Sequence, residues 1–150
     1  MMKKNHRVFL FVAFIVYIAL LIYLLFFRHR AADIPLTEYI RYSTNFIPFF
    51  SFYAFFTTPY ISYRVVVPFM VNLIGNMVLF LPWGIALPML NEKFVSAKRF
   101  FTLTAIVIIA VEILQILLQV GTCDIEDFLM NMIGAAAGFL ISKRILKKRA

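Results

Sequence analysis

The chain alternates long apolar runs with short polar segments, and four runs are long enough to cross a bilayer. The predicted spans cover residues 8–27, 66–90, 100–120 and 126–143. A helix of about 20 apolar residues crosses the hydrocarbon core. The first run is too long for the apolar region of a signal peptide and precedes a poor cleavage context, so we expect it to be retained. The pattern predicts an all-α, polytopic membrane protein, a four-transmembrane-helix bundle in one domain of residues 1–150.

An aromatic segment separates the first two predicted spans. Nine of the 18 residues from Phe46 to Tyr63 are Phe or Tyr. Such residues favour the boundary between hydrocarbon and headgroups. Pro48 and Pro59 oppose one long straight helix. We predict an interfacial or shallowly re-entrant segment, and the alternative is a fifth span.

Polar residues recur at helical spacing inside the last three spans. Offsets of 0, 3 and 7 fall within about a 60° stripe of a helix. This spacing occurs at Glu112, Gln115 and Gln119 and again at Asp124, Asp127 and Asn131, while Asn72 and Asn76 share a third face. All three faces are expected in the outer half of the bilayer, where contact with lipid is costly. The side chains should therefore face one another in a polar pocket that opens outward.

Two further polar residues, Arg41 and Asn45, lie in the loop expected above this pocket. Arg41 is the available cation for Glu112 or Asp127, and these two acids are the candidate catalytic residues. The residues predicted to bind a ligand are Arg41, Asn45, Asn72, Asn76, Glu112, Gln115, Gln119, Asp124, Asp127 and Asn131. Two alternatives remain open: the amides can simply hold the helices together, and Asp124 can be an N-cap.

Small residues mark one face of the last span. Gly134 and Gly138 are four residues apart with three alanines between them. Such a face allows close helix packing. We favour packing within the chain over homodimerisation, and the oligomeric state stays open.

Composition and charge agree with a membrane location. The chain is 63% hydrophobic and carries 15 Lys+Arg against 7 Asp+Glu. The basic residues cluster at the ends of apolar runs, which opposes a nucleic-acid-binding function and follows the positive-inside rule. Eleven Lys and Arg fall on the side of both termini and four on the other, so both termini are predicted to be cytoplasmic. With one cysteine and two isolated histidines, no disulfide, metal site or cofactor is expected.

Four motifs, in order, resemble the VanZ-like membrane protein family. They are NFIPF at 45–49, NLIGN at 72–76 running to FLPWG at 80–84, EILQ at 112–115, and DIED at 124–127 followed by Asn131, Gly134 and Gly138. Many relatives have an Arg before the acidic motif, where this chain has Gly121-Thr122-Cys123, and often Asp in place of Glu126. The resemblance implies a bacterial cytoplasmic-membrane protein. Its founding member is associated with reduced susceptibility to teicoplanin.

Three functions compete at this level. The first is a non-catalytic resistance or envelope protein whose pocket binds a lipid-linked intermediate or the lipid tail of a lipoglycopeptide. The second is an integral-membrane enzyme that acts on an envelope lipid, with Glu112 and Asp127 as acid and base. The third is a small transporter, although no inverted repeat is evident. Turnover of a lipid pool would identify the enzyme, and uptake driven by a proton gradient would identify the transporter.

Overall fold

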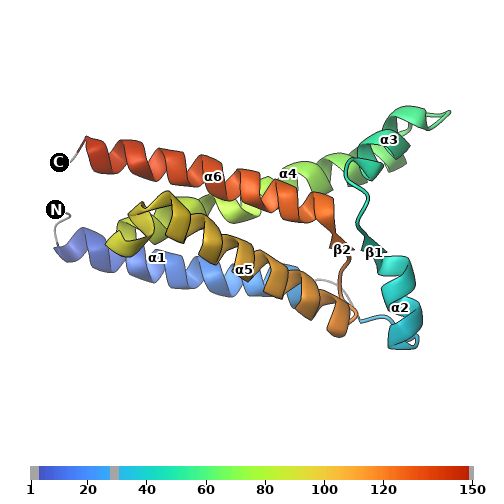
Figure 1. Cartoon of the computed structure of the whole chain (residues 1–150), viewed down its shortest axis with the longest axis horizontal. Coiled ribbons are helices and arrows are strands. Elements are labelled where there is room, and N and C mark those ends of the chain that lie inside the picture. The colour runs from blue at the N-terminus through green and yellow to red at the C-terminus, as the bar shows by residue number, and fades with distance from the viewer. Residues whose placement is uncertain (1–3, 28–30, 149–150) are drawn as a thin grey trace.

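Four long helices form the molecule, and they confirm the predicted all-α membrane bundle. The computed structural model describes residues 4–27 and 31–148. Its long helices are α1 (Lys4–Ile22, extended by the π-helical turn η1, Tyr23–Phe27), α4 (Tyr63–Leu90), α5 (Ala97–Leu117) and α6 (Ile125–Lys147). Within the described residues, these are the four helices long and apolar enough to cross a membrane. Figure 1 shows them side by side along the long axis of the molecule.

The bundle has two distinct ends (Figure 1). The start of α1, the end of α6 and the turn η2 (Glu92–Val95) between α4 and α5 lie together, and we call this the terminal end. The opposite end, which we call the loop end, carries the α5–α6 connection and residues 31–62. Four basic residues used in the charge count, Lys3, Arg28, Arg30 and Arg149, lie outside the described residues.

The predicted span boundaries differ from the observed helix ends by up to four residues, and the end of α5 has a clear structural cause. The apolar run predicted a helix that continues to residue 120, whereas α5 ends at Leu117. Gln119 has a φ of 56°, a left-handed conformation that stops a right-handed helix. The backbone N–H groups of Gln119 and Val120 instead bond the carbonyls of Ile116 and Gln115. Hydropathy does not record such a backbone turn, because the residues beyond it remain apolar.

The aromatic segment does not form a fifth span. It contains α3 (Phe50–Thr57), and α2 (Leu36–Ser43) and the two-residue strand β1 (Thr44–Asn45) precede it. With eight residues, α3 is about 12 Å long, well short of the hydrocarbon core. The ring of Phe55 in α3 stacks on the ring of Phe69 in α4, with the ring centroids 4.3 Å apart. The segment is thus a short helix packed against the start of α4.

Close contact between α4 and α6 depends on glycine. A Cβ added to Gly134 would overlap the backbone of Met77, and one added to Gly138 would overlap the carbonyl of Leu81. Gly84 on α4 would in turn meet the carbonyl of Ala135. Small residues let helix backbones approach in this way within a membrane. The prediction that the small-residue face packs within the chain is confirmed.

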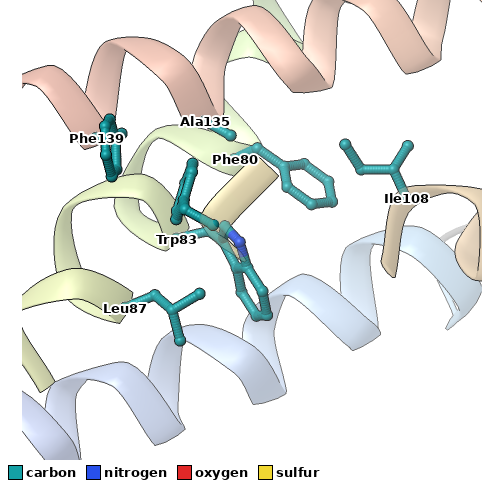
Figure 2. Packing of buried hydrophobic residues seen from close by; sticks show 7 residues of the cluster. Phe80, Trp83, Leu87, Ile108, Ala135 and Phe139 are labelled. Atoms are coloured by element: carbon teal, nitrogen blue, oxygen red, sulfur yellow. The ribbon is translucent and has the colours of Figure 1, made fainter. Parts of the chain in front are cut away.

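The hydrophobic core occupies the half of the bundle nearer the terminal end. Figure 2 shows Trp83 and Leu87 of α4 directed toward α1, with Phe139 on α6 and Ile108 on α5. Phe80, Phe100 and Ile108 are fully buried. The indole N–H of Trp83 donates to the hydroxyl of Thr104 at 3.1 Å, which satisfies both buried polar groups. This half is therefore closely packed, unlike the half that contains the polar residues.

Candidate binding cavity

A cavity of about 660 Å³ lies at the loop end of the bundle. Its walls come from all four long helices and from the α5–α6 connection. The residues that line it are Leu24, Leu25, Val67, Pro68, Val71, Asn72, Gly75, Asn76, Val78, Leu79, Val111, Glu112, Gln115, Val120, Gly121, Thr122, Asp127 and Asn131. Its volume falls within the range of small-molecule sites.

Six of the ten predicted ligand-binding residues meet in this cavity. They come from α4, α5 and α6, which are separated in sequence but adjacent in the bundle. The six are Asn72, Asn76, Glu112, Gln115, Asp127 and Asn131. Their helical spacing places each pair or triplet on one face, and the packing of the bundle turns these faces inward. The arrangement agrees with the predicted polar pocket.

Asp127 is held by the amide groups of α4. The Nδ2 of Asn76 donates to Oδ1 of Asp127 at 2.6 Å and to Oδ1 of Asn72 at 3.4 Å. A charge-assisted hydrogen bond of this length fixes the carboxylate on the cavity wall. The same bond joins α4 to α6 at the loop end, so Asn76 also contributes to helix association.

Glu112 and Asn131 each carry a buried oxygen without a partner. The side chain of Glu112 is 6% exposed and that of Asn131 is 3% exposed. Glu112 Oε2 and Asn131 Oδ1 accept no hydrogen bond from the described residues. Buried polar atoms are nearly always satisfied, and an unsatisfied one costs roughly 1–3 kcal/mol. Both residues line the cavity, so a bound molecule could satisfy their free oxygens.

Gln115 connects α5 to the π-helical turn that ends α1. Its Nε2 donates to the carbonyl of Leu25 in η1 at 3.1 Å. A π-turn disrupts the regular helix hydrogen bonds and is frequent at functional sites. Here it places Leu24 and Leu25 on the cavity wall, and Gln115 fixes that wall to α5.

Four predicted site residues do not line the cavity. Arg41 is exposed on α2 and is absent from the wall near Glu112 and Asp127. Gln119 lies beyond the end of α5, where its Nε2 donates to the carbonyl of Ile34 at 3.1 Å. The predicted stripe therefore loses its third member, because Gln119 is not helical.

Asp124 precedes α6 instead of lying on it. Its φ of −122° is extended, and its carboxylate caps the helix by accepting the backbone N–H of Glu126 at 2.8 Å. The N-cap alternative is thus confirmed. Asp124 also accepts a 3.2 Å hydrogen bond from Nδ2 of Asn45. These two residues hold chain segments together beside the cavity.

Residues 31–62, which we call the connecting segment, are fastened to the α5–α6 connection by several hydrogen bonds. Strand β1 pairs in parallel with β2 (Cys123–Asp124), with Thr44 opposite Cys123. Tyr39 Oη donates to the carbonyl of Gly121 at 2.6 Å, and the N–H of Ala32 donates to the carbonyl of Gln119. Gly121 lines the cavity, so the connecting segment supports its wall from outside.

Glu126 has a role that the sequence analysis did not identify. It is 4% exposed, and its Oε1 accepts the backbone N–H of Ser51 at 2.8 Å. Ser51 lies in the first turn of α3, where helix N–H groups lack partners within the helix. Glu126 therefore caps α3 from a distant part of the chain. No local pattern could reveal this contact, since it joins residues 75 positions apart.

A second, smaller cavity adjoins the first along α4. It has a volume of about 340 Å³ and lies between α3 and α4. Pro68 and Asn72 line both cavities. The second wall is formed largely by Phe50, Phe55 and Phe69. The polar cavity thus continues into an aromatic one.

The chemistry of the wall is acidic and amide-rich. Its described residues include two carboxylic acids, Glu112 and Asp127, and no Lys, Arg or His. Across residues 4–27 and 31–148, no group of three His, Cys, Asp or Glu side chains is placed to hold a metal ion. The available chemistry is hydrogen bonding, charge pairing and proton exchange at the two acids.

The amino-acid sequence matches one known protein family over most of its length. The sequence profile of the VanZ/LLP1 family matches residues 14–147. The chain belongs to the VanZ/LLP1 family. No curated protein and no solved structure matches it.

Membership of the VanZ/LLP1 family confirms the resemblance drawn from the four motifs. Three of them meet at the loop end, because NLIGN at 72–76, EILQ at 112–115 and the segment from DIED to Asn131 each place residues on the cavity wall. Most of the polar side chains on the cavity wall of this VanZ/LLP1 protein therefore come from these motifs.

Proposed function

We propose that this VanZ/LLP1 protein binds an envelope amphiphile in its polar cavity and thereby lowers susceptibility to teicoplanin-type glycopeptides. The ligand is a lipid-linked envelope intermediate or the lipid tail of a lipoglycopeptide. The observation that carries the proposal is a cavity of about 660 Å³ in which apolar walls surround two acids and several amides. Mostly apolar pockets with a few polar groups suit ligands of this kind.

The proposed location is the bacterial cytoplasmic membrane, with both termini in the cytoplasm. The support is the count of Lys and Arg along the sequence, in which 11 fall in the segments predicted on the side of both termini and 4 in the others, together with the positive-inside rule. In this orientation the loop end and its cavity lie in the outer half of the membrane. An amphiphile in the outer leaflet could then reach the cavity.

The chain's own residues suggest how such a ligand would be held. Glu112 and Asn131 offer unsatisfied buried oxygens to the polar head. Val67 and Val71 of α4, with Leu24 of η1, offer apolar wall to a chain. Asp127, held by Asn76, would fix the orientation of the head by a further polar contact.

Teicoplanin susceptibility in a sensitive Gram-positive strain tests the proposal. Wild type should protect the strain, while Glu112→Gln and Asp127→Asn, at matched membrane abundance, should not. Glu92→Gln is the control, because Glu92 is an exposed acid at the terminal end. Absence of protection by wild type would refute the resistance part of the proposal. Equal protection by all variants would refute the role of the cavity.

An enzyme that acts on an envelope lipid is the second candidate. It is favoured by the presence of two acids, Glu112 and Asp127, on the wall of one cavity. Two carboxyl groups in different surroundings can divide the roles of acid and base. Purified protein that converts an envelope lipid, and loses this conversion in Glu112→Gln, would favour the enzyme over simple binding.

A further inference from the structure

The polar part of the cavity contains two buried hydrogen-bond acceptors without a partner among the described residues. Glu112 Oε2 and Asn131 Oδ1 are free acceptors. Two of the amide donors nearby are engaged, since Asn76 Nδ2 bonds Asp127 and Asn72, and Gln115 Nε2 bonds a backbone carbonyl. A ligand that satisfies this wall must therefore bring N–H or O–H donors.

The charge of the cavity wall further restricts which ligand head group can bind. Glu112 and Asp127 can carry two negative charges, and no Lys, Arg or His occurs among the described lining residues. Uncompensated charge within a bilayer is costly, so acids at membrane depth are normally paired. A cation satisfies both requirements, and an anionic group such as a phosphate would be repelled from the same position. A primary ammonium supplies one positive charge with three N–H donors.

The surroundings of the cavity indicate that this cation is attached to an apolar chain. Val71 and Val78 line the cavity and are also 52% and 60% exposed. They lie on α4, a helix apolar enough to cross a membrane, so their exposed faces meet lipid. The cavity consequently reaches the lipid-facing surface along α4. An acyl chain can remain in the bilayer there while the head enters the cavity.

We propose that the cavity recognises an amphiphile with a primary ammonium head, placed between Glu112 Oε2, Asn131 Oδ1 and Asp127. This inference rests on the proposed function and specifies the class of its ligand. The head is an aminophospholipid or an amino-sugar glycolipid, which share the ammonium group. A quaternary ammonium head lacks N–H donors and leaves both free oxygens unsatisfied.

Native mass spectrometry of the full chain released from mixed-lipid nanodiscs tests this inference. The lipids are phosphatidylethanolamine, phosphatidylcholine and phosphatidylglycerol with identical acyl chains, and an alkyl glucosaminide with a free amine forms a separate arm. We expect phosphatidylethanolamine or the glucosaminide to be retained about tenfold over phosphatidylcholine. The amine of the first two lipids can donate charged hydrogen bonds to the cavity, whereas the quaternary ammonium of phosphatidylcholine can donate none. Whichever is retained identifies the source of the amine.

Variants separate the cavity from general lipid contact. Glu112→Gln should remove the preference for the amine, while Glu92→Gln should keep it. Asn131→Leu, which removes the second free acceptor, should weaken the preference without a change of charge. The wild-type comparison stands even where a variant fails to fold.

Two results would contradict the proposals in different ways. Retained lipid without preference for an amine, or with preference for phosphatidylglycerol, would overturn the ammonium inference alone. No lipid retained by wild type in any arm would overturn amphiphile binding itself, and with it the proposed function.

Discussion

At the scale of single residues, Glu112 conflicts with its surroundings. It lies among apolar residues of α5, is 6% exposed and has a buried oxygen without a partner among the described residues. Such local conflicts between a residue and its packing are expected at functional sites. Other buried polar residues differ, because Thr104 and Glu126 both have partners. The unsatisfied atoms, rather than burial alone, distinguish the residues of the proposed site.

Replacing Glu112 should stabilise the empty protein. Glu112→Met keeps the length of the side chain and removes the unsatisfied oxygen, so the free energy of unfolding should rise by roughly 1–3 kcal/mol. Thermal unfolding in detergent measures this, and the same variant should lose ligand binding. Destabilisation would show that Glu112 is satisfied in the protein as purified.

Cys123 should react slowly with alkylating reagents. Burial raises the pKa of its thiol, and the carboxylates of Glu112, Asp124 and Asp127 raise it further. Since the thiolate is the reactive form, less of it exists at a given pH than for a free thiol. A cysteine in a model peptide has a pKa of about 8.5. The pH midpoint of iodoacetamide labelling of Cys123 should therefore lie above the midpoint measured for such a peptide.

A charge variant gives the control for this labelling. Asp124→Asn removes one negative charge and keeps an effective N-cap residue, so the labelling midpoint should fall. An unchanged midpoint would show that the charge of Asp124 does not contribute to the shift. Labelling of intact cells by an impermeant reagent would also place Cys123 on the outer side, as proposed.

At the scale of elements, the contact between α4 and α6 fixes the bundle. Three glycines allow the two backbones to touch, and a Cβ at any of them would overlap main-chain atoms of the other helix. This contact also brings Asn76 of α4 to Asp127 of α6. Close packing in one half of the helix pair thereby positions polar groups in the other half.

Alanine at the contact should destabilise the protein, whereas alanine at the cavity should not. In Gly138→Ala the new Cβ meets backbone atoms of Leu81 and Gly84, so we expect a loss of roughly 1–3 kcal/mol. Gly75→Ala is the matched control, because nothing lies within 4 Å of its Cβ, and helix propensity should stabilise it by up to about 1 kcal/mol. Equal thermal stability of the two variants would contradict the packing.

The capping of α3 can be tested through its backbone. Glu126→Ala leaves the N–H of Ser51 without its 2.8 Å partner, which should cost about 1 kcal/mol. Hydrogen exchange in residues 50–57 should accelerate, while exchange in α5 should not change. Glu38→Ala, which replaces an exposed acid on α2, serves as the control. If exchange in residues 50–57 accelerated equally in the Glu38→Ala variant, this would argue against a specific cap by Glu126.

At the scale of the whole molecule, the bundle is divided into a packed half and a hollow half. The core of Phe80, Trp83 and Phe139 lies toward the terminal end, and the cavity lies at the loop end. The connecting segment is hydrogen-bonded to the α5–α6 connection beside that cavity. Close packing is thus concentrated in one half, and the polar groups line the cavity of the other half.

The pairing of β1 with β2 predicts that a cysteine introduced at position 44 will form a disulfide with Cys123. Thr44 lies opposite Cys123, a spacing of about 5 Å between neighbouring strands that suits an S–S bond. Oxidised Thr44→Cys should therefore show faster mobility on a non-reducing gel, which reductant reverses. Thr57→Cys, at the end of α3, is the control and should not cross-link to Cys123. Failure of Thr44→Cys to cross-link would contradict the pairing.

The sequence by itself determined the membrane helices, the family and most of the polar set. Hydropathy located the spans because each needs about 20 apolar residues, and helical spacing grouped Asn72 with Asn76 and Glu112 with Gln115. Both depend on local order along one helix. The family motifs identified the chain before any contact was known, and the VanZ/LLP1 match over residues 14–147 agrees.

Only the tertiary structure decided which polar residues share a cavity. Gln119 and Asp124 lie outside the wall, because α5 ends early at Leu117 and α6 begins after its cap at Asp124. Arg41 and Asn45 also lie outside it, on α2 and β1. The free oxygens of Glu112 and Asn131, and the bond from Glu126 to Ser51, depend on neighbours far along the chain. Such contacts have no local signature, since packing between helices selects them and the periodicity of one helix does not.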